Sequence, residues 1–317
     1  MADAFDRRAI TPGAVESRWE AADGHPIRRI DWSEPAGPPR GSLLFMPGRG
    51  DAYEKYLETF EYWRGRGWRV TAADWRGQAG SGRLGADAVT GHIDDFGAWV
   101  ADLAAFWAAW AKGRSGPLVL VGHSMGGHLA LRAVANEALD PAPNAVVLSA
   151  PMLDVMPERV PLAVRQGAAH LMCLIGDSRR PAWTWSERPG ELPAFRQTLL
   201  THDAERYADE GWWREARPEL VMGPGSWGWV RGAQASIRGL MRPGVLEAVT
   251  IPVFIVATRA DKLVSPRAIE RAAARLRNAR VLWFGDEAAH EILREVDAVR
   301  DRALEEIDRF LEGIGTP

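Results

Sequence analysis

Cysteine and long hydrophobic runs are scarce in this chain of 317 residues, and each scarcity excludes a class of protein. The single cysteine, Cys173, cannot form an internal disulfide, so the chain is no disulfide-stabilised secreted scaffold and suits a reducing compartment. No stretch reaches the roughly 18 uncharged apolar residues that cross a bilayer. Acidic side chains near the N-terminus stand where a secretory signal has its apolar core. We therefore expect a soluble, cytoplasmic protein.

A basic excess is also absent, because the formal net charge is −3. Binding to nucleic acid needs a concentration of positive charge, so no nucleic-acid partner is expected. Hydrophobic residues make up 46% of the chain, which is enough for a large core. Tryptophan is unusually common, with 15 copies against four tyrosines, and its distribution indicates where aromatic surface gathers.

Short apolar runs alternate with helical patterns from about residue 42, which is typical of an α/β fold with a mostly parallel sheet flanked by helices. Before them, two runs around Asp23-Gly24 predict an antiparallel hairpin. An apolar stripe at helical spacing predicts a core-packing helix near residues 96–110, Ser265-Pro266 predicts a helix start, and residues 292–311 predict a closing helix. The predicted core strands are 42–46, 69–73, 117–122, 145–150, 252–258 and 280–284.

The alternation stops between about residues 152 and 249, where proline, arginine and paired aromatics replace the strand pattern. We interpret this segment as a helical lid inserted between two core strands. The core itself is then built from residues 1–151 and 250–317.

A serine between two glycines marks the candidate nucleophile. The run Gly122-His123-Ser124-Met125-Gly126 matches the G-x-S-x-G pattern, directly after a predicted strand and directly before a predicted helix. Small flanking residues allow a sharp turn that presents the serine hydroxyl above the sheet edge. A hydroxyl is a poor nucleophile without an imidazole base and a carboxylate that orients it, so the chain must supply both.

Two loops downstream offer these partners in the expected order of serine, acid and histidine. Asp261 follows the strand that ends at Thr258, and His290 follows the next strand. Both loops open at the carboxyl edge of the sheet, where Ser124 also lies. The rivals are Asp154, which follows an earlier strand, and a group of residues for which structural roles are expected: His92, His123, His128 and Asp286.

Backbone amides are expected to stabilise the negative charge that develops on the attacked carbonyl. One is the amide of Met125, directly after the nucleophile. The other comes from the glycine-containing loop after the strand 42–46, where Arg49 is the preferred donor and Gly48 the alternative.

These motifs resemble those of α/β-hydrolases, in particular the bacterial lysophospholipase and monoacylglycerol lipase group, which is related to serine aminopeptidases. The resemblance extends from about residue 40 to 295, and one departure is Pro47-Gly48 where much of the wider group has His-Gly. Among the segments that carry it are "FMPGRGDAYEKY", "GHSMGGHLA", "ADKLVS" and "AAHEIL". It implies that Ser124, Asp261 and His290 form a catalytic triad and that Arg49 and Met125 supply the oxyanion amides.

The expected activity is hydrolysis of a carboxylic ester of a monoacyl lipid, a lysophospholipid or a monoacylglycerol, through an acyl-enzyme and without a metal or cofactor. The alternatives are a short-chain carboxylesterase, an aminopeptidase-type serine peptidase and a non-catalytic binding protein. A tryptophan-rich lid also suits transient contact with the inner face of a membrane, whereas the oligomeric state is left open. The acyl-chain wall is predicted from six tryptophans of the lid: Trp183, Trp185, Trp212, Trp213, Trp227 and Trp229.

Overall fold

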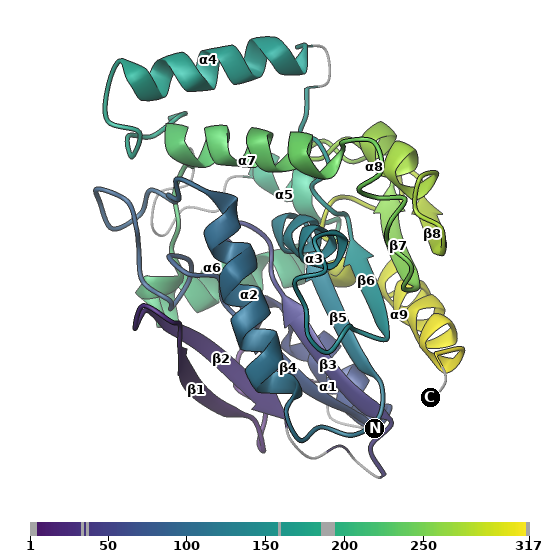
Figure 1. Cartoon of the computed structure of the whole chain (residues 1–317). Coiled ribbons are helices and arrows are strands. Elements are labelled where there is room, and N and C mark those ends of the chain that lie inside the picture. The colour runs from purple at the N-terminus through teal and green to yellow at the C-terminus, as the bar shows by residue number, and fades with distance from the viewer. Residues whose placement is uncertain (1–4, 33–34, 36–37, 158–159, 185–193, 315–317) are drawn as a thin grey trace.

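The computed structural model describes residues 5–32, 35, 38–157, 160–184 and 194–314. Its centre is an eight-stranded sheet in the order β1-β2-β4-β3-β5-β6-β7-β8 (Figure 1). Strand β2 is antiparallel to both of its neighbours, and all pairs from β4 to β8 are parallel. The strands are β1 (Val15–Glu20), β2 (Pro26–Trp32), β3 (Gly41–Met46), β4 (Trp68–Ala73), β5 (Leu118–His123), β6 (Ala145–Ser149), β7 (Val253–Thr258) and β8 (Ala279–Phe284).

The predicted mostly parallel sheet and the hairpin at Asp23-Gly24 are confirmed. The register aligns the carboxyl ends of the central strands, because Met46 pairs with Gly122 and His123 pairs with Ser149. The loops that follow these strands therefore open at one edge of the sheet. This edge is where an open α/β sheet places its ligand site.

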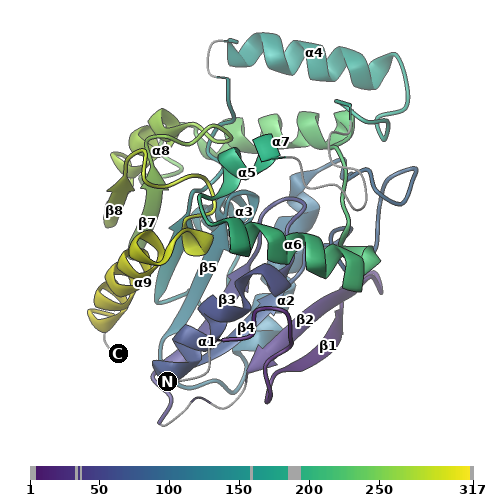
Figure 2. The same ribbon diagram turned by 180° about the vertical axis from the view of Figure 1, so that it is seen from behind.

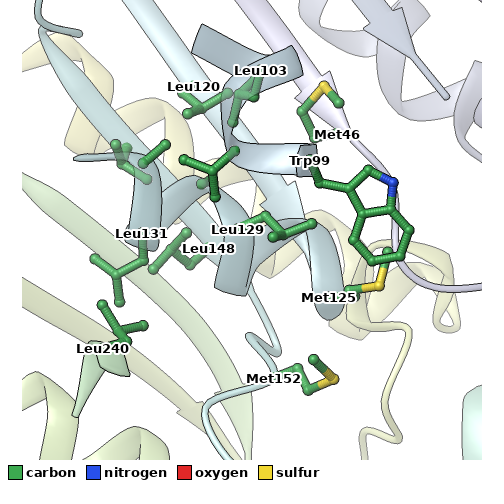
Figure 3. Packing of buried hydrophobic residues seen from close by; sticks show 14 of the residues in the cluster. Met46, Trp99, Leu103, Leu120, Met125, Leu129, Leu131, Leu148, Met152 and Leu240 are labelled. Atoms are coloured by element: carbon green, nitrogen blue, oxygen red, sulfur yellow. The ribbon is translucent and has the colours of Figure 1, made fainter. Parts of the chain in front are cut away.

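Helices cover both faces of the sheet. One face carries α2 (Phe96–Ala111), α3 (Met125–Ala135) and α8 (Pro266–Ala273), and the other carries α1 (Leu57–Gly65) and α9 (Asp297–Glu312), as Figures 1 and 2 show. Figure 3 shows the core under α2 and α3, where Trp99 and Leu103 of α2 lie near Leu120 of β5 and Leu129 of α3. The predicted start of α8 is confirmed, because the Ser265 hydroxyl accepts a hydrogen bond from the amide of Ala268 at 2.9 Å.

The prediction of one closing helix over 292–311 is wrong at its start. A short 3₁₀ helix, η3 (Ile292–Arg294), precedes α9, and Glu295 between them is extended. The Glu295 carboxylate is fully buried and accepts hydrogen bonds from the amides of Ala289 at 2.7 Å and His202 at 3.0 Å. These tertiary contacts interrupt the helix where its periodicity predicts continuation.

Among the described residues between β6 and β7, the chain forms four α-helices and one 3₁₀ helix. They are α4 (Leu162–Leu174), α5 (Ala194–Leu200), α6 (Ala204–Ala216), η2 (Pro218–Leu220) and α7 (Trp227–Leu240). We call residues 152–249 the insertion. In both views α4 is outermost and lies along α7, at the opposite end of the molecule from the termini (Figures 1 and 2). In the described part of the chain, no helix combines the length and hydropathy needed to cross a membrane.

Candidate active site

Ser124 occupies a strained turn between β5 and α3. Its backbone has φ +51° and ψ −115°, a conformation that is costly for a residue with a side chain. The turn depends on glycine at two positions, because a Cβ at Gly122 would lie 2.7 Å from the Gly126 backbone, and a Cβ at Gly126 would lie 2.3 Å from the Met46 carbonyl oxygen. The G-x-S-x-G pattern is therefore a steric requirement of this turn.

The structure brings Ser124, His290 and Asp261 together. His290 Nε2 lies 2.9 Å from Ser124 Oγ, and His290 Nδ1 lies 2.7 Å from Asp261 Oδ2. The other carboxylate oxygen of Asp261 accepts hydrogen bonds from the amides of Leu263 at 2.8 Å and Val264 at 2.9 Å. The imidazole is thus oriented by a carboxylate that is itself fixed by the backbone.

The electrostatics of this group follow from burial and pairing. Burial opposes protonation of His290, but the adjacent Asp261 carboxylate prevails and raises the pKa of the imidazole. Burial likewise disfavours the Asp261 carboxylate, yet His290 and the two amides hold the pKa of Asp261 below its ordinary value. The neighbouring His123 is fully buried beside His290, and both effects lower its pKa to about 4. His123 therefore stays neutral at physiological pH.

The rival residues have other partners. Asp154 forms an ion pair with Arg165 at 3.0 Å and accepts a hydrogen bond from the Val155 amide, while Asp286 is exposed. The ring of His92 lies 2.7 Å from the hydroxyl of Ser226, directly before α7, and the ring of His128 lies 2.6 Å from the hydroxyl of Ser236 within α7. These contacts agree with structural roles for both histidines.

The loop after β3 lies against the nucleophile, because a Cβ at Gly48 would be 3.2 Å from the Ser124 Cβ. The Gly48 amide donates to Asp51 at 3.3 Å, and the Gly50 amide donates to Gln78 at 2.8 Å. Met125 is the first residue of α3, whose N-terminus carries a partial positive charge. The loop and the helix start both lie beside Ser124, and the roles of Arg49 and Met125 remain predictions.

The Arg49 side chain connects this loop to the insertion. Its guanidinium donates to the Gly223 carbonyl at 2.7 Å and lies 5.1 and 5.2 Å from the ring centroids of Trp183 and Trp229. Such cation–π contacts stabilise a positive charge against an aromatic face.

Ser124 and His290 line a cavity of about 480 Å³. Its apolar side is formed mainly by residues after β6, in α7 and after β7, and its charged side by residues near η1 (Tyr53–Tyr56), α5, α6 and His290. The apolar side includes Met152, Val155, Met156, Trp229, Val230, Leu263 and Val264, and the charged side includes Asp51, Lys55, Arg196, Arg214 and Glu291.

Two of the six predicted tryptophans, Trp183 and Trp229, line this cavity. Trp213 is instead buried in the core, where its indole N–H donates to the Arg7 carbonyl at 3.0 Å, and Trp212 packs edge-on against it. Trp227, at the start of α7, is not among the described residues that line the cavity, and Trp185 lies outside the described residues. The structure therefore places Trp183 and Trp229 at the cavity and Trp213 in the core, and the acyl-chain wall stays a prediction.

Sequence reasoning missed the charged side of the cavity. The Lys55 ammonium contacts Asp51 at 2.8 Å and Glu210 at 3.3 Å, and it also contacts Glu291. Arg196 and Arg214 bind Glu210 at 2.9 and 2.6 Å, and Arg294 binds Glu291. We call these seven residues the charged cluster. No sequence signal marks it, because its members lie on four separated segments.

Three of the buried groups have the spacing of metal ligands. One atom each of Asp51, His123 and Glu291 lies within 4.8 Å of the others. The Lys55 ammonium already contacts both carboxylates and neutralises charge that a metal ion would otherwise balance. The residues present therefore fit an ion-pair cluster better than a metal site.

The sequence matches the Hydrolase_4 family, described as serine aminopeptidase, S33, over residues 37–297. The chain belongs to this family. Among characterised members of the wider group, lysophospholipase L2 of Escherichia coli (strain K12) is 29% identical over 299 residues, an alignment that covers 87% of this chain and 81% of the relative. The predicted membership of the α/β-hydrolases, in the lysophospholipase and monoacylglycerol lipase group, is confirmed.

Solved structures share the fold of this hydrolase. A soluble variant of monoglyceride lipase from Saccharomyces cerevisiae, in complex with a substrate analog, superposes with a TM-score of 0.78 at 19% identity and covers 97% of both chains. The monoacylglycerol lipase of Paleococcus ferrophilus gives a TM-score of 0.70 at 19% identity, covering 91% of this chain and 99% of its own.

Proposed function

We propose that this hydrolase cleaves carboxylic esters of monoacyl lipids, lysophospholipids or monoacylglycerols, through an acyl-enzyme on Ser124. The observation that carries the proposal is the continuous contact from Asp261 through His290 to Ser124 at the edge of a cavity with an apolar side. The names of the relatives, lysophospholipase L2 and monoglyceride lipase, support the same class of substrate.

In the proposed reaction, His290 Nε2 takes the hydroxyl proton of Ser124 while Oγ attacks the ester carbonyl carbon. The tetrahedral intermediate collapses when the imidazolium gives that proton to the leaving alcohol oxygen, and the acyl group stays on Ser124. Water then attacks the acyl-enzyme by the same proton transfers and releases the fatty acid. Asp261 remains ionised and holds the Nδ1–H of His290 throughout.

The amides of Met125 and Arg49 are the proposed donors to the oxyanion. Both belong to segments that lie against Ser124, and the Gly48 and Gly50 amides on either side of Arg49 donate to Asp51 and Gln78. Preorganised donors of this kind stabilise the developing charge without reorganising during the reaction.

The two-sided cavity supports an amphiphilic ester as substrate. An acyl chain fits the side formed by Met152, Val155 and Leu263, and a polar leaving group fits the side that carries the charged cluster. A peptidase of the aminopeptidase type needs a carboxylate for the substrate amine. The two carboxylates in the described lining, Asp51 and Glu291, both contact Lys55, which favours the ester substrate over an amine.

A substrate panel on the purified protein tests the proposal. Monoacylglycerols and lysophospholipids should be hydrolysed with higher kcat/KM than p-nitrophenyl acetate, and aminoacyl amides should be poor substrates. A fluorophosphonate should label one site and end activity, whereas Ser124→Ala should lose both labelling and turnover. Labelling or activity that survives Ser124→Ala contradicts the assignment of the nucleophile, and preference for aminoacyl amides supports the peptidase instead.

We further propose that the insertion acts as a lid that touches a lipid surface through α4. Val164, Leu171 and Leu174 of α4 are exposed by 59%, 54% and 69%, and Ile175, which follows the helix, is exposed by 66%. Met156 and Trp183, which are also exposed, precede and follow α4 in the sequence and line the cavity. Leu174→Gln together with Ile175→Gln should reduce sedimentation with phosphatidylglycerol vesicles while turnover of p-nitrophenyl acetate is retained; unchanged sedimentation contradicts this role.

A further inference from the structure

Lys55 lies where three parts of the candidate active site meet. It belongs to η1, and its side chain is only 5% exposed. An ammonium group carries three N–H donors and no acceptor, and here it contacts three carboxylates, those of Asp51, Glu210 and Glu291. Burial opposes the charged form, but the three carboxylates together raise the pKa of Lys55 above its ordinary value.

Each of these carboxylates belongs to a different functional segment. Asp51 holds the loop beside the nucleophile, because it accepts hydrogen bonds from the Gly48 and Ala52 amides at 3.3 Å each and from the Tyr56 hydroxyl at 2.7 Å. Its position therefore determines how that loop lies against Ser124.

Glu291 directly follows His290, and its amide donates to the Leu200 carbonyl at 2.7 Å at the end of α5. Glu210 lies in α6 and forms ion pairs with Arg196 and Arg214. One ammonium group thus joins the proposed oxyanion loop, the histidine loop and the insertion.

We propose that Lys55 is a positioning residue. It couples the position of the insertion on the core to the geometry of the oxyanion loop and of His290. The inference rests on the proposed hydrolase function. Without the ammonium, Glu210 and Glu291 keep their arginine partners, whereas the buried Asp51 carboxylate loses the cation that it pairs with. A buried charge that has lost its counter-ion shifts its position or takes up a proton. The loop beside Ser124 then loses the anchor that keeps its amides aligned. The effect falls on the chemical step and leaves the apolar side of the cavity intact.

The variant Lys55→Ala tests this coupling, because it removes a fragment with the shape of n-propylammonium from a wall of the cavity. For p-nitrophenyl butyrate we expect kcat to fall roughly 100-fold, the scale of losing one oxyanion donor, with KM changed less than threefold. Because Lys55 lines the cavity, added n-propylammonium can reach the vacated position. It should raise kcat of Lys55→Ala at least tenfold.

One control distinguishes the effect of charge from the effect of filling the vacated volume. The others distinguish loss of the coupling from general damage to the fold. Propionamide has a similar size but no charge and should not restore activity, and Ser124→Ala should stay inactive with n-propylammonium. Lys112→Ala changes an exposed lysine after α2, and its kcat should equal that of the unchanged protein. Asp51→Asn leaves Lys55 paired with Glu210 and Glu291, and we expect it to fold and to lower kcat by about 10-fold or more.

The inference is overturned if a folded Lys55→Ala or Asp51→Asn keeps kcat within threefold, or if propionamide restores as much activity as n-propylammonium. If Lys55→Ala does not fold, Asp51→Asn alone decides. A failure of the proposed function is seen separately, because the unchanged protein would then lack esterase activity or Ser124→Ala would keep it.

Discussion

The sheet and the insertion are stabilised in different ways. Strands β3, β5, β6 and β7 are buried along their whole length, so the turn that carries Ser124 is supported by closely packed backbone. Helices α6 and α7 of the insertion are held to the core by buried side chains such as Trp213 and Leu240 and by polar contacts such as that of Lys55 with Glu210. The outermost helix of the insertion, α4, exposes large apolar side chains.

This difference in packing suggests different roles for the core and the insertion. The core holds Asp261, His290 and Ser124 in one continuous hydrogen-bonded chain, which the proposed proton transfers require. The insertion supplies much of the lining of the cavity, and its outermost helix α4, with large exposed side chains, can vary in sequence without disturbing the triad residues. Changes in the two regions should therefore have different signatures.

The largest expected effect comes from the acid of the core. Asp261→Asn should lower kcat by about 10⁴-fold near neutral pH, because the imidazole of His290 loses the carboxylate that selects its tautomer. Asp154→Asn is the matched change at the start of the insertion, where the carboxylate pairs with Arg165, and it should keep kcat within threefold. Steady-state kinetics on p-nitrophenyl butyrate check both variants. A larger loss in Asp154→Asn would show that the acid is misassigned.

Two glycine substitutions compare backbone packing in the two regions. Gly126→Ala places a methyl group 2.3 Å from a backbone oxygen of β3, so it should destabilise the fold by about 3 kcal/mol and lower Tm by roughly 4–5 °C. Gly167→Ala in α4 meets no atom within 4 Å and should stabilise the helix by about 0.5–1 kcal/mol. Thermal melts measure both variants. Similar shifts of Tm in the same direction would contradict the difference in packing between the core and α4.

Two similarly exposed tryptophans of the insertion sharpen the comparison within that segment. Trp183 lines the cavity and is 43% exposed, whereas Trp212 is 37% exposed and packs on Trp213. Burial of each acyl methylene is worth about 0.8 kcal/mol, or up to roughly fourfold in kcat/KM. Trp183→Ala should flatten the rise of kcat/KM with chain length, and Trp212→Ala should preserve it. Equal slopes in a chain-length series would remove Trp183 from the acyl-chain wall.

The smallest expected effect is a shift in pH dependence. A general base must be neutral, so kcat/KM should rise with pH as His290 loses its proton. Because Asp261 raises the pKa of His290, the midpoint of this rise should lie above the ordinary histidine value of about 6.5. Asp261→Asn removes the carboxylate charge, so the midpoint of its residual activity should move to lower pH. A midpoint that does not respond to Asp261→Asn would mean that another group titrates.

The sequence by itself determined the elements whose causes are local. Strand and helix periodicity located the sheet, and the glycines around Ser124 indicated a turn that admits no Cβ at Gly122 or Gly126. The order of Asp261 and His290 along the chain placed both at the edge where Ser124 lies, because parallel strands end together. These predictions succeed because spacing of a few residues carries the necessary information.

Only the tertiary structure decided what depends on distant segments. Tertiary packing placed Trp183 and Trp229 at the cavity and Trp213 in the core, although all three belong to one tryptophan-rich stretch. Glu295 broke a periodic helix because its carboxylate binds amides from two other segments. Lys55 became the partner of three carboxylates, two of them more than 150 residues away in the sequence. No local pattern encodes such contacts, since burial and pairing arise only when separate elements pack together.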